Sequence, residues 1–152
     1  MLNQKTHNYI LYLVRRLNKK YNKSIILFYN PKCNRSNIIF NEKKNQHLFT
    51  YGDKLITNAI NEKSHYRDHL RYVISHELGH VVHNLPYETF NDKVENEYSA
   101  ERFALNYLKE NYQKTYVWCC KVGFSMVHDS KWATCKSESH YRKAWERVVE
   151  YN

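Results

Sequence analysis

Two long segments of the chain carry apolar residues at helical spacing. In residues 3–20 the apolar positions recur every three or four residues, which places them on one face of an α-helix. Within this segment they are Ile10, Leu13, Val14 and Leu17, and Tyr21 continues the stripe one residue beyond it. Residues 68–84 repeat the pattern with Leu70, Ile74, Leu78 and Val81, and Leu85 continues it one residue beyond the segment. We expect an amphipathic helix at each place, the second one ended by Pro86.

Short apolar runs bounded by turn residues lie between these two helices. Residues 24–29 are β-branched and aromatic, and Asn30-Pro31 follows them. Residues 38–40 and 47–51 form two further runs. We expect each to be a strand, and a fourth strand over residues 54–60, joined to residues 47–51 by a turn at Gly52-Asp53.

The pattern after residue 92 predicts mainly helices. Residues 93–111 place five residues on one face: Glu97, Ala100, Glu101, Ala104 and Leu108. Alanines on such a face allow the backbone of a neighbouring helix to approach closely. Residues 116–122 are apolar on both faces, which fits a strand or a buried helix. Ser137 or Ser139 is expected to cap a last helix with the stripe Tyr141, Ala144, Trp145 and Val148.

A row of ring side chains follows a second face of the helix at residues 68–84: His69, Tyr72, His76, His80 and His83. Within it, residues 76–80 read H-E-L-G-H. Residues four apart share a helix face, so His76 and His80 can present two imidazoles to one metal ion. Glu77 would sit beside that metal, where a carboxylate can act as the general base of a metallopeptidase.

A catalytic zinc needs a third protein ligand and an open position. A metzincin would have a histidine six residues after His80, where this chain has Pro86, so that class is excluded. Glu97, on the next predicted helix, is the best candidate, with Glu95 and Glu101 as alternatives. We interpret His83 as a surface residue or as a support for a ligand rather than as a fourth ligand.

The motif H-E-L-G-H, followed by E-Y-S-A-E-R-F-A at residues 97–104, resembles the ImmA/IrrE group of zinc metallopeptidases, and gluzincins more broadly. The resemblance covers residues 54–108. It implies one zinc per chain, bound by His76, His80 and Glu97, with Glu77 as general base. It also implies that Glu101, where the family commonly has Asn or Asp, steadies a ligand imidazole. Residues 112–152 match no family pattern.

The same resemblance implies an α+β, zincin-like fold. In it a small mixed or antiparallel sheet packs on the helix that carries H-E-x-x-H and on the following helix that carries the glutamate. Zincins offer the strand before the active helix to an extended substrate, so residues 55–60 would bind the substrate by β-augmentation. The length of 152 residues predicts a single domain, residues 1–152.

The N-terminus lacks the apolar block of a signal peptide, and no apolar run is long enough to cross a bilayer. We therefore expect a cytoplasmic protein without membrane contact. Four cysteines (Cys33, Cys119, Cys120 and Cys135) show no scaffold spacing and are interpreted as reduced thiols. A second metal site formed by the last three cysteines with His128 or His140 lacks a C-x-x-C pair, so ordinary buried cysteines are favoured.

The chain has 24 Lys and Arg against 15 Asp and Glu, a net charge of +9. This charge favours acidic partners, but the basic residues are scattered, so nucleic-acid contact is weakly supported. The sequence predicts a zinc metallopeptidase that cleaves a specific protein, with a transcriptional repressor of a phage or mobile element as the suggested substrate. The alternatives are a SprT-like protease acting on DNA-bound proteins and a non-catalytic zinc-containing protein-binding or DNA-binding module. Four residues are unranked candidates for stabilising an oxyanion: Tyr112, Tyr116, His128 and His140.

Overall fold

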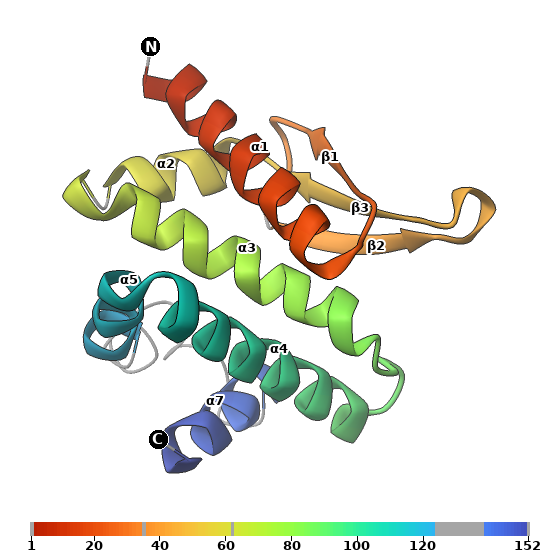
Figure 1. Ribbon diagram of the computed structural model, residues 1–152. Coiled ribbons are helices and arrows are strands. Elements are labelled where there is room, and N and C mark those ends of the chain that lie inside the picture. Colours follow the sequence, from red (N-terminus) through yellow and green to blue (C-terminus); the bar gives the residue numbers. More distant parts are fainter. Residues whose placement is uncertain (1, 35, 62, 124–138, 152) are drawn as a thin grey trace. The chain divides into compact units, whose positions relative to one another are not determined.

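The computed structural model describes residues 2–34, 36–61, 63–123 and 139–151. The described chain is mostly helical and has a small three-stranded mixed sheet, as the α+β prediction requires (Figure 1). The longer elements are α1 (Leu2–Tyr21), β1 (Ile25–Tyr29), β2 (Asn37–Asn41), β3 (Gln46–Tyr51), α2 (Asp53–Asn61), α3 (Tyr66–His83), α4 (Phe90–Asn111), α5 (Gln113–Trp118) and α7 (His140–Tyr151). Short 3-10 turns lie at Glu42–Lys44 and Lys63–His65, and a π-helical turn, η3, lies at Cys119–Gly123.

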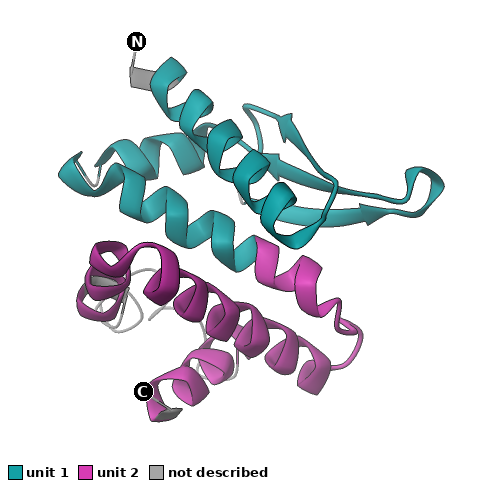
Figure 2. Cartoon of the chain, viewed as in Figure 1, with its two compact units in different colours: residues 1–77 teal, residues 78–152 magenta. Residues whose placement is uncertain are grey.

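The chain divides into two compact units, residues 1–77 and residues 78–152, with the boundary inside α3 (Figure 2). The first unit contains α1, the sheet, α2 and the beginning of α3. The second contains the end of α3 and the helices that follow it. The single domain expected over residues 1–152 stays a prediction.

In the first unit, α1 buries the apolar face that the sequence predicts. Ile10, Leu13 and Leu17 are each at most 2% exposed. The helix stops where Asn22 adopts a left-handed conformation (φ 50°) and the backbone N–H of Lys23 donates to the carbonyl of Asn18. The Asn18 side chain then pairs with both backbone groups of Ile25, at 3.0 Å each, and so joins the end of α1 to β1.

The sheet has the order β1-β3-β2, with β3 in the centre. β1 pairs with β3 in parallel and β2 pairs with β3 antiparallel, so Phe49 lies opposite Leu27 on one side and Ile38 on the other. Phe49 is only 1% exposed and is the largest of the fully buried side chains. The three strands expected over residues 24–29, 38–40 and 47–51 are confirmed.

The fourth expected strand is wrong, because residues 54–60 belong to the helix α2. Its buried residues Leu55, Ile56 and Ala59 lie at i, i+1 and i+4, which is a helical stripe, and the two residues between them are exposed. Gly52 is not the tip of a hairpin. A Cβ there would lie 2.4 Å from the carbonyl oxygen of Cys33, so glycine is needed for close backbone packing. The substrate-docking strand expected at residues 55–60 is therefore absent.

In the second unit, the α3–α4 connection is fixed by residues at both of its ends. α3 ends at His83, before Pro86, because Asn84 adopts a left-handed conformation (φ 46°) and donates its N–H to the carbonyl of His80. α4 begins at Phe90, earlier than expected. Thr89 and Asp92 form a capping box there, each side chain accepting the other's backbone N–H at 3.1 Å.

The C-terminal helix α7 packs on α4 through Ala144 and Val148, which are fully buried. Ser139 caps it, as one of the two expected candidates: its hydroxyl accepts the N–H of Arg142 and its carbonyl accepts the N–H of Lys143. The other candidate, Ser137, lies outside the described residues. Residues 116–122, left open between strand and helix, are helical.

No helix in the described ranges combines the length and the apolar composition that crossing a membrane requires.

Candidate metal centre

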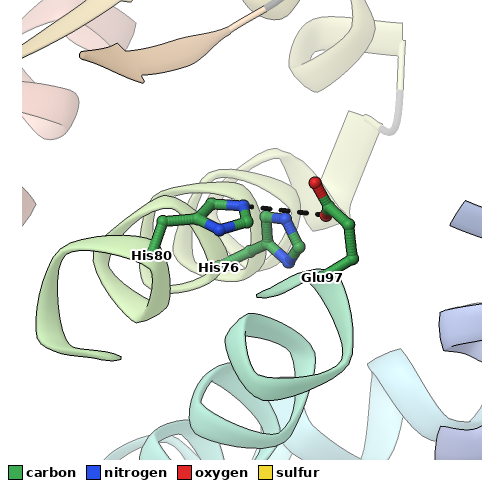
Figure 3. A group of neighbouring side chains, drawn as sticks. All are labelled: His76, His80 and Glu97. Carbon is green, nitrogen blue, oxygen red and sulfur yellow. Dashed lines mark ion pairs between the residues drawn. The ribbon is translucent and has the colours of Figure 1, made fainter. Parts of the chain in front are cut away.

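Three of the residues predicted to bind metal come together in the structure. His76 and His80 lie one turn apart on α3, and Glu97 lies in the second turn of α4. One ligand atom from each residue can be chosen so that all three atoms lie within 4.8 Å of one another. Both imidazoles and the carboxylate point toward the same small volume (Figure 3).

Close approach of α3 and α4 brings Glu97 to the histidines. Gly79 packs directly against Ala100, since a Cβ at residue 79 would lie 2.6 Å from the Cα of Ala100. Ala100 and Ala104 are fully buried. The expectation that small residues on this face of α4 admit a neighbouring helix is confirmed for Ala100, and the small partner on α3 is the glycine within H-E-L-G-H.

His80 is oriented by Asn96, the residue before Glu97. The Asn96 amide nitrogen donates to the carbonyl of Leu85 at 2.9 Å and, more weakly, to that of Pro86 at 3.4 Å. Its amide oxygen is therefore the atom that faces Nδ1 of His80, so His80 must donate from Nδ1. The lone pair of the neutral ring then lies on Nε2, which is 3.6 Å from Oε2 of Glu97.

Glu97 is oriented from its other oxygen. The hydroxyl of Tyr87 donates to Oε1 of Glu97 at 3.2 Å, which leaves Oε2 directed at the imidazole of His80. Tyr87 also lies 2.9 Å from Nε2 of His140. Burial raises the pKa of Tyr87 well above its ordinary value, and the negative charge of Glu97 raises it further, so Tyr87 remains a donor at neutral pH.

Asn96 and Tyr87 are the site residues that the sequence reasoning missed. Asn96 belongs to no motif. It lies four residues before Ala100, however, and therefore on the face of α4 that meets α3, next to the candidate ligand Glu97. This spacing is a signal that could have identified it. Tyr87 lies in a connection between helices, where helical periodicity places no side chain. Glu101, expected to steady a ligand, is 4% exposed on α4, and its role stays a prediction.

Other residues of the histidine row have different environments. His69 is 8% exposed, and burial lowers its pKa from 6.5 to about 4, so its ring is neutral at pH 7. His83 is exposed, and its ring meets that of Phe103 edge-on. Glu95, an alternative ligand, is exposed and paired with Arg147. Neither His83 nor Glu95 belongs to the metal group.

The donor set fits a divalent transition metal. Two imidazoles and one carboxylate leave an open position in a tetrahedral zinc site, although iron and manganese accept the same three ligands. Across the described ranges, His76, His80 and Glu97 are the one group of three such donors. A second site with Cys119 and Cys120 is not found among them, and Cys135 and His128 lie outside the described residues.

Glu77, the predicted general base, is half-buried on α3 between the two ligand histidines. Of the candidates for stabilising an oxyanion, His140 lies beside Tyr87, and Tyr116 hydrogen-bonds with Cys120, which raises its pKa.

No family model, curated protein or solved structure matches the chain. The resemblance to ImmA/IrrE metallopeptidases stays a prediction from the motif residues.

Proposed function

We propose that the chain is a zinc-dependent metallopeptidase of the kind in which H-E-x-x-H is completed by a glutamate from the next helix. The observation that carries the proposal is the convergence of His76, His80 and Glu97, whose ligand atoms lie within 4.8 Å of one another. An incidental pair of histidines on a helix surface would need neither a buried carboxylate opposite them nor a glycine that lets the two helices touch.

The chemistry assigns one task to each residue. His76, His80 and Glu97 hold the metal, and bound zinc supplies Lewis acidity at the position that the three ligands leave open. Glu77 follows the first ligand on the same helix turn, where its carboxylate can take a proton from the attacking water and later deliver it to the leaving amine. His80 and Glu97 enter this reaction already oriented, by Asn96 and Tyr87.

The substrate is proposed to be a protein, with a transcriptional repressor of a phage or mobile element as the specific suggestion that the family resemblance offers. The net charge of +9 would favour a substrate bound to DNA. With residues 54–60 forming a helix, substrate docking on a strand there no longer supports the proposal.

A SprT-like protease is less well supported, because such enzymes use a third histidine as ligand. His83 is the candidate on α3, and its ring contacts Phe103 and is not part of the metal group. A non-catalytic zinc module would use the same ligands but would not need Glu77.

Two measurements separate these functions. Elemental analysis of the purified protein should find about one zinc per chain, lost in Glu97→Gln but kept in Glu110→Gln, a matched control at an exposed position of the same helix. Glu77→Gln should keep zinc and fold but lose cleavage of a peptide mixture followed by mass spectrometry. Absence of zinc from the wild type would overturn the proposal, and full cleavage by Glu77→Gln would overturn the enzymatic role.

A further inference from the structure

Building on the proposed zinc site, we propose that Tyr87 and His140 form a positioning pair that fixes the Glu97 carboxylate for the metal, so that the C-terminal helix α7 is a functional part of the metal centre. Neither residue is a metal ligand in this assignment, since the metal group contains neither. His140 lies within residues 112–152, the segment that matches no family pattern.

A glutamate ligand needs orientation because its carboxylate can rotate and can offer one oxygen or two. Tyr87 donates to Oε1 at 3.2 Å, while Oε2 faces Nε2 of His80 at 3.6 Å. The two oxygens are therefore already distinguished, one held by a hydroxyl and the other directed at the donor atom of a neighbouring ligand. Hydrogen bonds of this kind to ligating carboxylates tune metal sites.

Tyr87 is itself held in place. The connection between α3 and α4 is anchored by Asn96, which donates to the carbonyls of Leu85 and Pro86, the two residues before Tyr87. The ammonium group of Lys93 lies 5.5 Å from the centre of the Tyr87 ring. The same asparagine that orients His80 thus fixes the backbone from which Tyr87 reaches Glu97.

His140 completes the pair from the first residue of α7. A hydroxyl has one proton, and Tyr87 gives it to Glu97, so the contact of 2.9 Å with Nε2 of His140 is a hydrogen bond that the imidazole donates. The two rings also meet edge-on, with centroids 5.8 Å apart. Two hydrogen bonds in series result: His140 donates to Tyr87, and Tyr87 donates to Glu97.

The position of His140 depends on how α7 sits on α4. Ala144 and Val148 are fully buried, and Arg147 pairs with Glu95 while its guanidinium lies 4.1 Å from the centre of the Tyr98 ring. These contacts hold α7 against the turn of α4 that carries Glu97. Two sets of contacts therefore connect α7 with Glu97: the packing of α7 on α4, and the hydrogen bonds through His140 and Tyr87.

The test is zinc affinity, measured by competition with a chromophoric chelator on the full chain. Tyr87→Phe removes one hydroxyl, and because the residue is 43% exposed, the remaining ring should not disturb folding. We expect about a 10- to 100-fold loss of affinity. Tyr98→Phe is the matched control, since it deletes a hydroxyl one residue from Glu97 and keeps the ring that contacts Arg147. Its affinity should equal that of the wild type.

His140 is tested through its dependence on Tyr87. His140→Ala should lower zinc affinity less than Tyr87→Phe, and His140→Gln, which keeps an N–H donor, should restore part of the loss. Because His140 acts through the tyrosine, the double variant Tyr87→Phe/His140→Ala should bind zinc no more weakly than Tyr87→Phe alone. The visible absorption of Co²⁺ bound to Tyr87→Phe should also differ from that of the wild type, which a loss of stability alone would not produce.

The outcomes separate this inference from the proposed function. If the wild type binds zinc and Tyr87→Phe binds it equally well with the same cobalt spectrum, the positioning pair is refuted and the metallopeptidase proposal stands. If the two substitutions weaken binding independently, the link through Tyr87 is refuted. If the wild type binds no zinc, the proposed function fails and the inference fails with it.

Discussion

Gly79→Ala would test the close contact that brings the ligands of α3 and α4 together. The added Cβ would lie 2.6 Å from the Cα of Ala100 and 2.8 Å from its carbonyl oxygen. Both are backbone atoms, so no side-chain rotation can relieve the contact. Ordinary contact begins at 3.4 Å, which requires α3 and α4 to separate locally by about 0.8 Å, the difference between 3.4 and 2.6 Å.

Two opposing terms set the effect on stability. Replacing a glycine in a helix by alanine gains about 1 kcal/mol of helix propensity. Overpacking a tight interface costs about 1–3 kcal/mol and sometimes more, and contact with backbone belongs at the upper end. We expect a net decrease of about 1–2 kcal/mol in the free energy of unfolding, measured by urea denaturation of the metal-free protein.

Zinc affinity should fall more sharply than stability. Protein ligands must hold a metal within about 0.2 Å of the ideal distance, and a separation of about 0.8 Å exceeds that tolerance several times over. Ala100→Gly provides the control: combined with Gly79→Ala it should not restore affinity, since the methyl group it removes is not among the nearest atoms. A Gly79→Ala protein as stable as the wild type, with unchanged zinc affinity, would refute this account of the interface.

Three further predictions concern single side chains. Asn96→Ala should reduce zinc affinity about 10- to 100-fold in chelator competition, because His80 loses the acceptor that fixes its Nδ1 proton; unchanged affinity would contradict the assigned tautomer. Thr89→Ala should lower the free energy of unfolding by about 0.5–2 kcal/mol in urea, because the capping box with Asp92 is lost; an equal midpoint would show that the cap contributes nothing. The folded protein holds His69 neutral, with a pKa of about 4 against an ordinary 6.5. Above pH 6.5 the ring is neutral in both the folded and the unfolded state. As pH falls toward 4 only the unfolded state takes up the proton, so the free energy of unfolding decreases by roughly 3 kcal/mol. Metal-free His69→Asn should therefore show a shallower decline in stability between these pH values than the wild type, and parallel curves would contradict the shift.

Helical elements with a strong apolar stripe could be predicted from the sequence, because one buried face is enough to define them. The predicted α1 and α4 differ from the structure only near their ends. Those ends depend on local hydrogen bonds that periodicity does not contain, such as the left-handed Asn84 and the capping box at Thr89. The strand predicted over residues 54–60 is wrong because β-branched residues and the preceding Gly-Asp dipeptide are typical of strands and hairpins, whereas the helical stripe there is short.

The candidate site divides in the same way. The three proposed ligands could be predicted because helical spacing and the known chemistry of H-E-x-x-H constrain them. Asn96 and Tyr87 could not, since their contacts depend on how the connection between α3 and α4 is folded. The place of His140 beside Tyr87 was even less predictable from the sequence, because it depends on the packing of α7 on α4.

The short connection between α3 and α4, residues 84–89, also has a consequence for the order of folding. His80 and Glu97 are separated by only 17 residues, so bringing them together closes a small loop and loses little chain entropy. Contacts this local form early, whereas His140 follows Glu97 by a further 43 residues. We expect Zn²⁺ in the refolding buffer to accelerate the formation of this helical hairpin in stopped-flow circular dichroism. The same acceleration should persist in His140→Ala, because the imidazole would arrive only after the ligands have met.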